Sequence, residues 1–244
     1  MIRFYRDRGR VIGAAVPPVI FWFFIGSGLG GSFSVGGEPG GLTYLQYFFP
    51  GTLVLIFLFT AVFSMISIIE DRREGFLQSV LVAPVPGYVI VIGKILGSSS
   101  LAFVQGIPFL LIAPFVGIGL GSAGSFAASL IILFSVSFSL SAMGFIIAWK
   151  LDSTQGFHAV MNMFLIPMWL LSGALFPVAG MHSWLAPLAK VNPLTYCIAA
   201  LQHQFFAPGA VGNLPSMPFC ITMMALFCAT VFCAALWVYG HGRR

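Results

Sequence analysis

The chain contains six apolar stretches, each about as long as a helix that crosses a lipid bilayer. They cover residues 11–30, 47–69, 95–118, 126–149, 157–177 and 219–239. A transmembrane helix needs about 20 apolar residues, whereas a strand of a membrane barrel has about ten and alternates in polarity. The sequence therefore predicts an all-α membrane protein with six transmembrane helices, organised as a single transmembrane domain over residues 1–244.

The low content of charged residues excludes a soluble globular protein. Only 7% of the 244 residues are charged and 59% are hydrophobic, whereas soluble domains carry about 25% charged residues. The net charge of +5 does not indicate a nucleic-acid partner, because the basic residues stand in short clusters between apolar stretches, as they do beside membranes. We therefore expect membrane lipid around the chain and no nucleic acid as a partner.

The basic residues also predict the orientation of the chain. If the N-terminus is cytoplasmic and the chain crosses six times, the C-terminus is cytoplasmic too. Ten of the eleven basic residues then lie on the cytoplasmic side: Arg3, Arg6, Arg8, Arg10, Arg72, Arg73, Lys94, Lys150, Arg243 and Arg244. Lys190 alone lies outside, and such a bias is typical of membrane proteins. We expect the first apolar stretch to be a retained helix and not a cleaved signal peptide.

The cytoplasmic connection, residues 70–87, carries a helical pattern of apolar side chains. Phe76 stands four residues before Val80, and Leu77 four before Leu81, which predicts a short amphipathic helix. This helix either lies passively on the inner membrane surface or docks a cytoplasmic partner, and its pattern fits both.

Two external connections differ in character. Residues 31–42 are rich in glycine and predict a loop. The external segment, residues 178–218, is too apolar for a mobile loop. We expect parts of it to re-enter the outer leaflet between the fifth and sixth spans.

No motif indicates catalysis, nucleotide binding or a metal site. Residues 87–94 look like a phosphate-binding loop, but the glycine spacing is wrong and Ile95 stands where a Ser or Thr must meet magnesium. Gly26, Gly28 and Gly31 match a dinucleotide fingerprint in spacing only, since no strand precedes them. The four cysteines lack metal-ligand spacing. We expect no catalytic residues, no cofactor and no metal.

Two pairs of glycines and one histidine within the spans are open to interpretation. Gly26 with Gly30, and Gly93 with Gly97, have the four-residue spacing that lets helices approach closely. Helix packing, within the chain or between subunits, is the favoured interpretation of both pairs. His158 is the ionisable residue well inside a span, which suggests a function, but its place near the inner edge also suits a solvated side chain.

Three groups of residues resemble one membrane-protein family in order and spacing. They are Phe49-Pro50-Gly51; Arg73-Glu74-Gly75 with Pro84 and Gly93-Lys94; and residues 167–177 with Trp184-Leu185 and Asn192-Pro193-Leu194-Thr195-Tyr196. With these residues the chain resembles the type-2 ATP-binding-cassette (ABC) exporter permeases, which move drugs, lipids or glycans out of bacterial cells. The resemblance covers nearly the whole chain.

The resemblance implies a permease subunit of the bacterial cytoplasmic membrane that hydrolyses no ATP itself. Two copies, as a homodimer or as a heterodimer with a similar permease, would enclose the pathway, and two separate ABC ATPase subunits would drive it. The implied ATPase-coupling residues are Arg73, Glu74, Gly75, Phe76, Leu77, Gln78, Val80 and Leu81. The implied residues of an external re-entrant gate are Ser172, Gly173, Phe176, Pro177, Trp184, Asn192, Pro193 and Tyr196.

The alternative function is a secondary transporter driven by an ion gradient. Coupling to protons or sodium usually uses acidic or paired charged residues near the membrane midplane. No Asp or Glu lies within the six predicted spans, which favours a machine powered from outside the membrane. A membrane enzyme is disfavoured because no His, Asp and Glu side chains converge in the predicted topology.

Overall fold

The computed structural model describes residues 8–29, 34–35, 41–75 and 86–241, and these are almost entirely helical. A helix coincides with each of the six apolar stretches. In chain order these are α2 (Arg8–Gly28), α3 (Tyr44–Ser64) continued by α4 (Ile66–Arg73), α6 (Gly87–Leu110) followed by the 3-10 helix η1 (Ala113–Val116), α7 (Ala123–Lys150), α8 (Thr154–Leu170) and α11 (Met217–His241).

Four of these helical segments are long and apolar enough to cross a membrane. They are 44–73, 87–116, 123–150 and 217–241. The apolar part of α2, Ile12–Gly28, is shorter, and α8 has 17 residues. The predicted multi-pass α-helical membrane fold is confirmed at this level, while the crossing of α2 and α8 stays a prediction.

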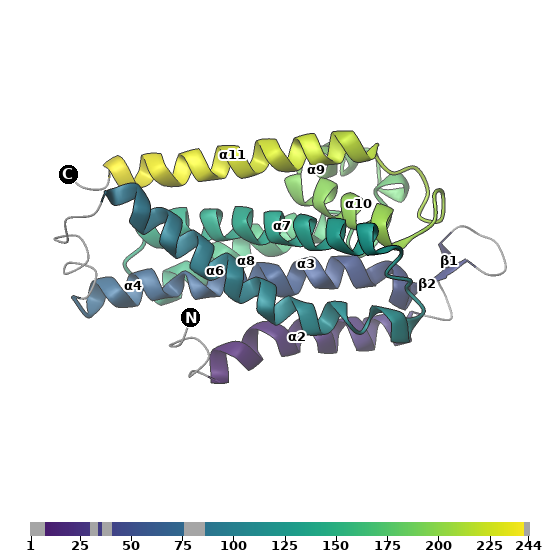
Figure 1. The fold of residues 1–244 in the computed structure, drawn as a ribbon, viewed down its shortest axis with the longest axis horizontal. Helices are drawn as coiled ribbons and strands as arrows, with labels where there is room; N and C mark the ends of the chain where they lie inside the picture. The colour runs from purple at the N-terminus through teal and green to yellow at the C-terminus, as the bar shows by residue number, and fades with distance from the viewer. Residues whose placement is uncertain (1–7, 30–33, 36–40, 76–85, 242–244) are drawn as a thin grey trace.

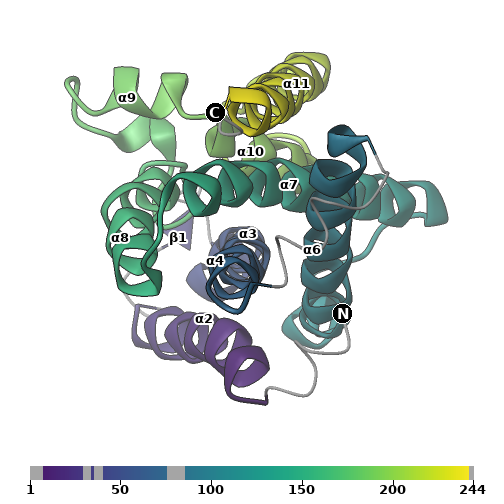
Figure 2. The same cartoon turned by 90° about the vertical axis from the view of Figure 1, so that its left-hand side faces the viewer.

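The helices form one bundle around α3. Figures 1 and 2 show α2, α6, α7 and α8 around α3, and α11 on the far side of α7. The most apolar window of the α3–α4 segment is 83% buried, whereas that of α11 is 22% buried. The helices α2, α6 and α8 run in one direction and α3, α7 and α11 in the other (Figure 1). Because so little of α11 is buried, this helix offers most of its apolar side chains to lipid or to another subunit.

The helices extend beyond the predicted spans at one end of the bundle. The helical chain continues through α4 to Arg73, and α6 begins at Gly87, eight residues before the predicted third span. The predicted third span begins after Lys94, because a lysine usually marks the edge of a span. In the structure Lys94 forms an ion pair with Asp71. The lysine can therefore lie inside the helix without an unpaired positive charge.

The connections at the opposite end contain short ordered elements. Strands β1 (Ser34–Val35) and β2 (Leu42–Thr43) pair antiparallel within the segment predicted as a loop. The external segment contains the 3-10 helix η2 (Val178–Gly180), α9 (Ala186–Val191) and α10 (Pro193–Phe205). Nearly all residues of α10 are buried against α11, α7 and α3, which explains why this segment is so apolar.

Four serines from three helices form a hydrogen-bonded network inside the bundle. Ser64 of α3 and Ser98 of α6 bond to each other, and Ser98 Oγ donates to the carbonyl oxygen of Ala61 at 2.7 Å. Ser141 of α7 donates to Ser98 Oγ at 3.0 Å. Ser99 Oγ lies 3.3 Å from Ser141 Oγ and 2.6 Å from the carbonyl oxygen of Ile95, to which it donates more closely. All four serines are buried. The network joins α3, α6 and α7 where apolar side chains alone would not fix their rotation.

We expect Ser98→Ala to lower the free energy of unfolding by about 1 kcal/mol, the usual size of a hydrogen bond between membrane helices. Ser135→Ala is the matched control, because Ser135 Oγ bonds within its own helix, to the carbonyl oxygen of Ile131. Unfolding in mixed micelles with increasing SDS measures both variants. An equal loss in the two variants would show that the network contributes nothing specific.

Candidate functional site

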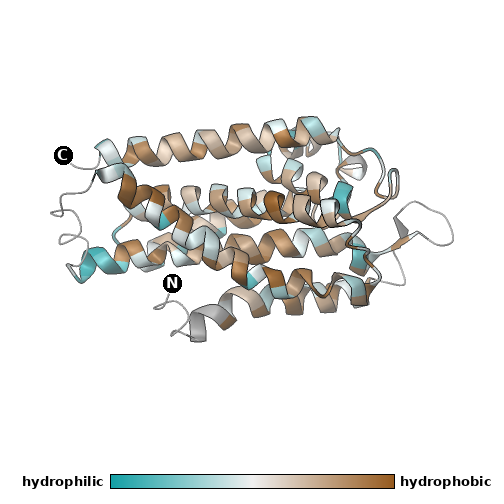
Figure 3. Cartoon of the chain, in the orientation of Figure 1, coloured by the Kyte–Doolittle hydropathy of each residue, from teal (hydrophilic) through white to brown (hydrophobic). Residues whose placement is uncertain are grey.

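Helix α4 places four consecutive charged residues, Glu70 to Arg73, at one end of the bundle. Figure 3 shows this segment as a hydrophilic tip on a hydrophobic helix. The two arginines stand in the last turn, where positive charge is favourable near the negative end of the helix dipole. We call the end of the bundle that carries Asp71, Arg72, Arg73, Lys94 and Asp152 the charged end.

Asp71 connects α4 to α6. Its side chain is 7% exposed, and its Oδ2 accepts a hydrogen bond from Lys94 Nζ at 2.6 Å. A carboxylate buried to this degree needs a hydrogen-bonded cation, because an uncompensated buried charge costs several kcal/mol. The pair therefore fixes where the start of α6 lies relative to α4.

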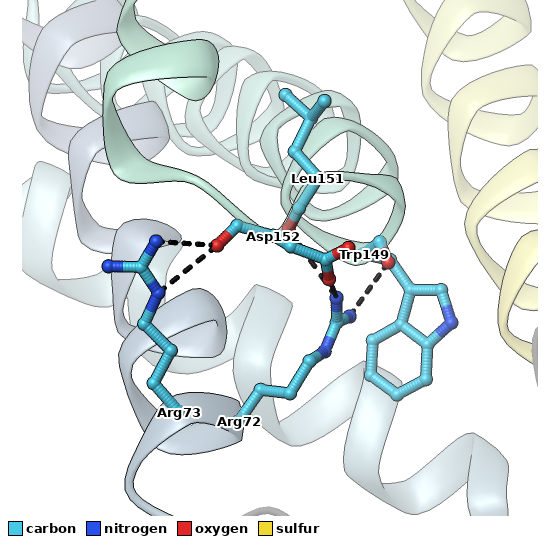
Figure 4. Close-up of polar contacts among 5 residues, drawn as sticks. All are labelled: Arg72, Arg73, Trp149, Leu151 and Asp152. Carbon is cyan, nitrogen blue, oxygen red and sulfur yellow. Dashed lines mark hydrogen bonds and ion pairs between the residues drawn. The ribbon is translucent and has the colours of Figure 1, made fainter.

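Arg72 connects α4 to the end of α7 (Figure 4). Its Nη2 donates to the carbonyl oxygen of Trp149 at 2.7 Å, and its Nη1 donates to Asp152 Oδ1 at 2.7 Å. The guanidinium carbon lies 5.5 Å from the centroid of the Trp149 ring, within range of a cation–π contact. The last carbonyl groups of a helix lack partners within it, and Arg72 supplies one at the C-terminus of α7.

Arg73 holds the same turn from the other side. Its Nε and Nη2 donate to the backbone carbonyl oxygen of Asp152 at 3.1 and 2.8 Å. Asp152 thus contacts both arginines, through its side chain and its backbone (Figure 4). The Asp152 side chain is 88% exposed, so its ion pair alone contributes little to stability. The effect of these contacts is to tie α4 to the turn between α7 and α8.

The predicted coupling residues begin inside this charged end. Arg73 is the last residue of α4, Glu74 is its C-cap, and Gly75 follows directly. The remaining predicted coupling residues, Phe76, Leu77, Gln78, Val80 and Leu81, lie outside the described residues. A displacement of the chain at Gly75 would move α6 through the ion pair of Asp71 with Lys94. It would move the α7–α8 turn through the hydrogen bonds of the two arginines.

At the opposite end, the segment that follows α8 is fastened to α3. Tyr47 Oη donates to the carbonyl oxygen of Gly173 at 2.7 Å, and Tyr44 Oη donates to that of Leu175 at 2.8 Å. In return, Trp169 Nε1 donates to the carbonyl oxygen of Gly51 at 2.8 Å. These bonds hold residues 171–177, which we call the gate segment, against the first half of α3.

Two glycines permit this contact. A Cβ atom on Gly51 would lie 2.7 Å from Ala174 Cβ and 2.9 Å from Ala174 Cα, closer than carbon atoms can approach. Gly173 has a φ of +82°, a conformation that side chains other than glycine rarely adopt. The backbones of α3 and the gate segment therefore touch at positions where only glycine fits.

The other predicted gate residues fall into three groups. Asn192 caps α10 by accepting from Leu194 N at 3.1 Å, and its Nδ2 donates to the carbonyl oxygen of Met168. Pro193 is the first residue of α10, where its missing N–H is not needed. Phe176 and Trp184 are exposed. They are placed to contact lipid or another molecule and not the interior.

A cavity of about 640 Å³ brings four of the predicted gate residues together. They are Ser172, Gly173, Pro177 and Tyr196. The lining also includes Tyr47, Lys190 and Gln202. We call this space the outer cavity; it lies at the end of the bundle opposite the charged end.

The structure bears differently on the predictions for the glycine pairs and for His158. Gly26 lies against the side chain and backbone of Leu45 on α3, which fits close packing of α2 and α3, and Gly30 lies outside the described residues. A Cβ atom on Gly93 or Gly97 would meet open space, so packing there stays a prediction about contacts beyond this subunit. His158 is exposed, and its ring lies edge-on to that of Phe63 of α3, with the ring centroids 5.2 Å apart.

Several residues of both sites were not singled out from the sequence. Asp152 is one of only six acidic residues in the chain and follows Lys150 closely at the end of an apolar stretch, which is the signal that could have found it. Tyr47 stands one turn before Gly51, and Gln202 is a polar residue in an apolar helix. Nothing local in the sequence indicates that Tyr47 and Gln202 line the same cavity.

Comparisons with known proteins place these sites in context. Residues 1–206 match the family described as ABC-2 type transporter. The chain is 32% identical to the transport permease ycf38 of Cyanophora paradoxa over 163 residues, which are 66% of this chain and 56% of that protein. It is 25% identical to nodulation protein J of Sinorhizobium fredii over 91% of this chain and 84% of that protein. It is 26% identical to the inner membrane transport permease YadH of Escherichia coli over 94% of this chain and 89% of that protein.

Proposed function

The chain belongs to the ABC-2 type transporter family, and on that premise we propose that it is the membrane-spanning subunit of an ATP-driven exporter. It is a multi-pass integral protein of the inner membrane and a transport permease. Energy comes from a separate ABC ATPase subunit, two copies of which bind a dimer of permeases. The whole chain, residues 1–244, acts as one transmembrane domain.

The observation that carries this proposal is the linkage of α4 to its neighbours at the charged end. Asp71, Arg72 and Arg73 connect the helix directly before residues 76–81 to α6 and to the α7–α8 turn. A partner that pushes on residues 74–81 therefore displaces three helices together. Such a linked element can be biased between two arrangements by ATP-driven closure of the partner.

Six crossings with both termini in the cytoplasm are supported by the alternating directions of the helices and by the positive-inside bias. In this orientation the charged end is cytoplasmic and faces the ATPase. The outer cavity and α9 and α10 then lie at the outer leaflet, where the apolar α10 re-enters the membrane. Cargo leaves past the gate segment, in the outward direction.

A dimer is supported by the apolar side chains that one subunit leaves uncovered. Phe23 and Phe24 of α2 and Met163 and Phe164 of α8 are more than half exposed. Six helices are also few for a closed pathway across a membrane. A second copy, or a similar permease, covers part of this surface and completes the pathway, and lipid covers the rest.

Nothing in the described residues favours the alternative, an ion-gradient-driven transporter. Four acidic residues are described: Glu70 and Asp71 in α4, Glu74 at its C-cap and Asp152 at the turn after α7. All four thus lie at the charged end. Proton or sodium coupling usually needs such groups near the middle of the membrane. An energy source docked at the charged end fits this distribution better.

Co-purification with the cognate ATPase tests the proposal. We expect the chain alone to hydrolyse no ATP and to form a stable complex with the ATPase. Glu74→Arg is expected to weaken the complex by about tenfold, because a reversed charge at a docking surface opposes association by more than 1 kcal/mol. Trp184→Ala, at the opposite end, should bind normally. ATP hydrolysis by the isolated chain, or equal binding by both variants, would contradict the proposal.

A further inference from the structure

The outer cavity is lined by both polar and apolar side chains, which we call its polar wall and its apolar wall. The polar wall includes Tyr47, Ser172, Thr195 and Gln202, each more than nine-tenths buried. The apolar wall includes Val178, Met181, Leu214 and Phe219. Its volume of about 640 Å³ is typical of sites that enclose a small molecule or a headgroup. A lining that contains both kinds of side chain suits an amphipathic ligand.

The hydroxyl groups of the polar wall present acceptors to a ligand. Tyr47 Oη and Thr195 Oγ1 donate their protons to the carbonyl oxygens of Gly173 and Ala189, both at 2.7 Å. Ser172 Oγ donates to the carbonyl oxygen of Trp169. A hydroxyl that has donated its proton keeps lone pairs that accept hydrogen bonds. The Gln202 side chain already bonds to Tyr47 Oη, so Ser172 and Thr195 are the main acceptors for a ligand. A ligand with hydroxyl groups of its own supplies the matching donors.

The charge of the lining selects an anion. Among the described residues that line the outer cavity, Lys190 is the one charged side chain and none is acidic. Lys190 is exposed, so its ammonium group lies where a ligand at the water interface can reach it. A quaternary ammonium headgroup finds no carboxylate partner in this lining, whereas a phosphate finds Lys190.

We propose that the outer cavity binds the headgroup of an anionic lipid that carries hydroxyl groups, such as a phosphoglycerol headgroup. The headgroup hydroxyls donate to the polar wall, the phosphate lies beside Lys190, and the acyl chains follow the apolar wall into the outer leaflet. The inference concerns one subunit and requires no ATPase, so its failure would leave the proposed coupling untouched.

Native mass spectrometry of the detergent-solubilised protein tests this site with phosphatidylglycerol and phosphatidylcholine as probes. We expect tighter binding of phosphatidylglycerol. Lys190→Gln should weaken that binding about fivefold, the effect of removing one lysine near an anionic lipid. Lys150→Gln, at the charged end, is the matched control and should retain it. Ala199→Leu, which fills the cavity with a larger apolar side chain, should also reduce bound phosphatidylglycerol.

Three results would overturn the assignment. They are equal binding of the two lipids, equal effects of Lys190→Gln and Lys150→Gln, and unchanged binding in Ala199→Leu. Soluble glycerol phosphate separates a lipid from a free phosphate compound. Weak displacement of the lipid by glycerol phosphate supports a lipid site, because the acyl chains contribute to affinity. Glycerol phosphate that binds as tightly as the lipid would reject it.

Discussion

An Arg72→Ala, Arg73→Ala double variant is expected to lose the coupling between movement of α4 at the charged end and movement at the opposite end of the bundle. The two side chains make four hydrogen bonds of 3.1 Å or less to Trp149 and Asp152. Hydrogen bonds to charged groups contribute about 1.5–3 kcal/mol each, but exposed ones contribute less, and the Asp152 side chain is 88% exposed. Without them, a push on α4 no longer displaces the α7–α8 turn.

The readout is the labelling rate of a cysteine introduced at the exposed Trp184, compared with and without ATP in the complex with the ATPase. We expect the ATP-dependent change in rate to fall about tenfold or more in the double variant. Lys150→Ala is the control, because it removes a basic residue from the last turn of α7 without touching the contacts of α4. An unchanged ATP response in the arginine variant would contradict the linkage.

Gly51→Ala is expected to be strongly destabilising although it adds a single methyl group. The new Cβ would meet Ala174 at 2.7 Å and the backbone of Ala174 at 2.9 Å. Extra atoms in a closely packed contact cost about 1–3 kcal/mol. The bond from Trp169 Nε1 to the carbonyl oxygen of Gly51 would be strained by the same displacement, so the gate segment should detach from α3.

Gly93→Ala is the matched control for this effect. A Cβ at Gly93 meets open space, so alanine there should be neutral or stabilising by up to about 1 kcal/mol through helix propensity. Unfolding in mixed micelles compares the two variants. Ala174→Gly combined with Gly51→Ala should restore part of the loss, since it removes one of the two clashing atoms. Equal stability of Gly51→Ala and Gly93→Ala would contradict the packing described here.

The positions of the helices could be predicted because apolar length and charge are local properties. Each predicted span coincides with a helix. Residues 178–218 contain the buried α10, and their predicted re-entry into the membrane stays a prediction. The helix ends could not be predicted. Helix α6 begins at Gly87 and includes Lys94, which is paired with Asp71, 23 residues away in the chain.

The sites depend still more on contacts between distant residues. Asp152 meets Arg72 across 80 positions in the sequence, and Tyr47 meets Gly173 across 126. Spacing indicated Gly26, Gly93 and Gly97 as packing positions. Gly26 does lie close to a neighbouring helix, but Gly93 and Gly97 do not, and other close approaches are at Gly51, Gly87 and Gly106. Spacing shows that two glycines share a helix face, but the neighbouring helix determines whether that face is crowded.

Photo-crosslinking tests the central claim most directly, that energy enters from a separate ATPase at the segment after α4. A photoreactive residue in place of Glu74 should cross-link to the ATPase in the intact complex, and the same residue in place of Trp184 should not. Cross-linking to the ATPase from position 184 with none from position 74 would contradict the account, because the charged end would then not be the end that faces the ATPase.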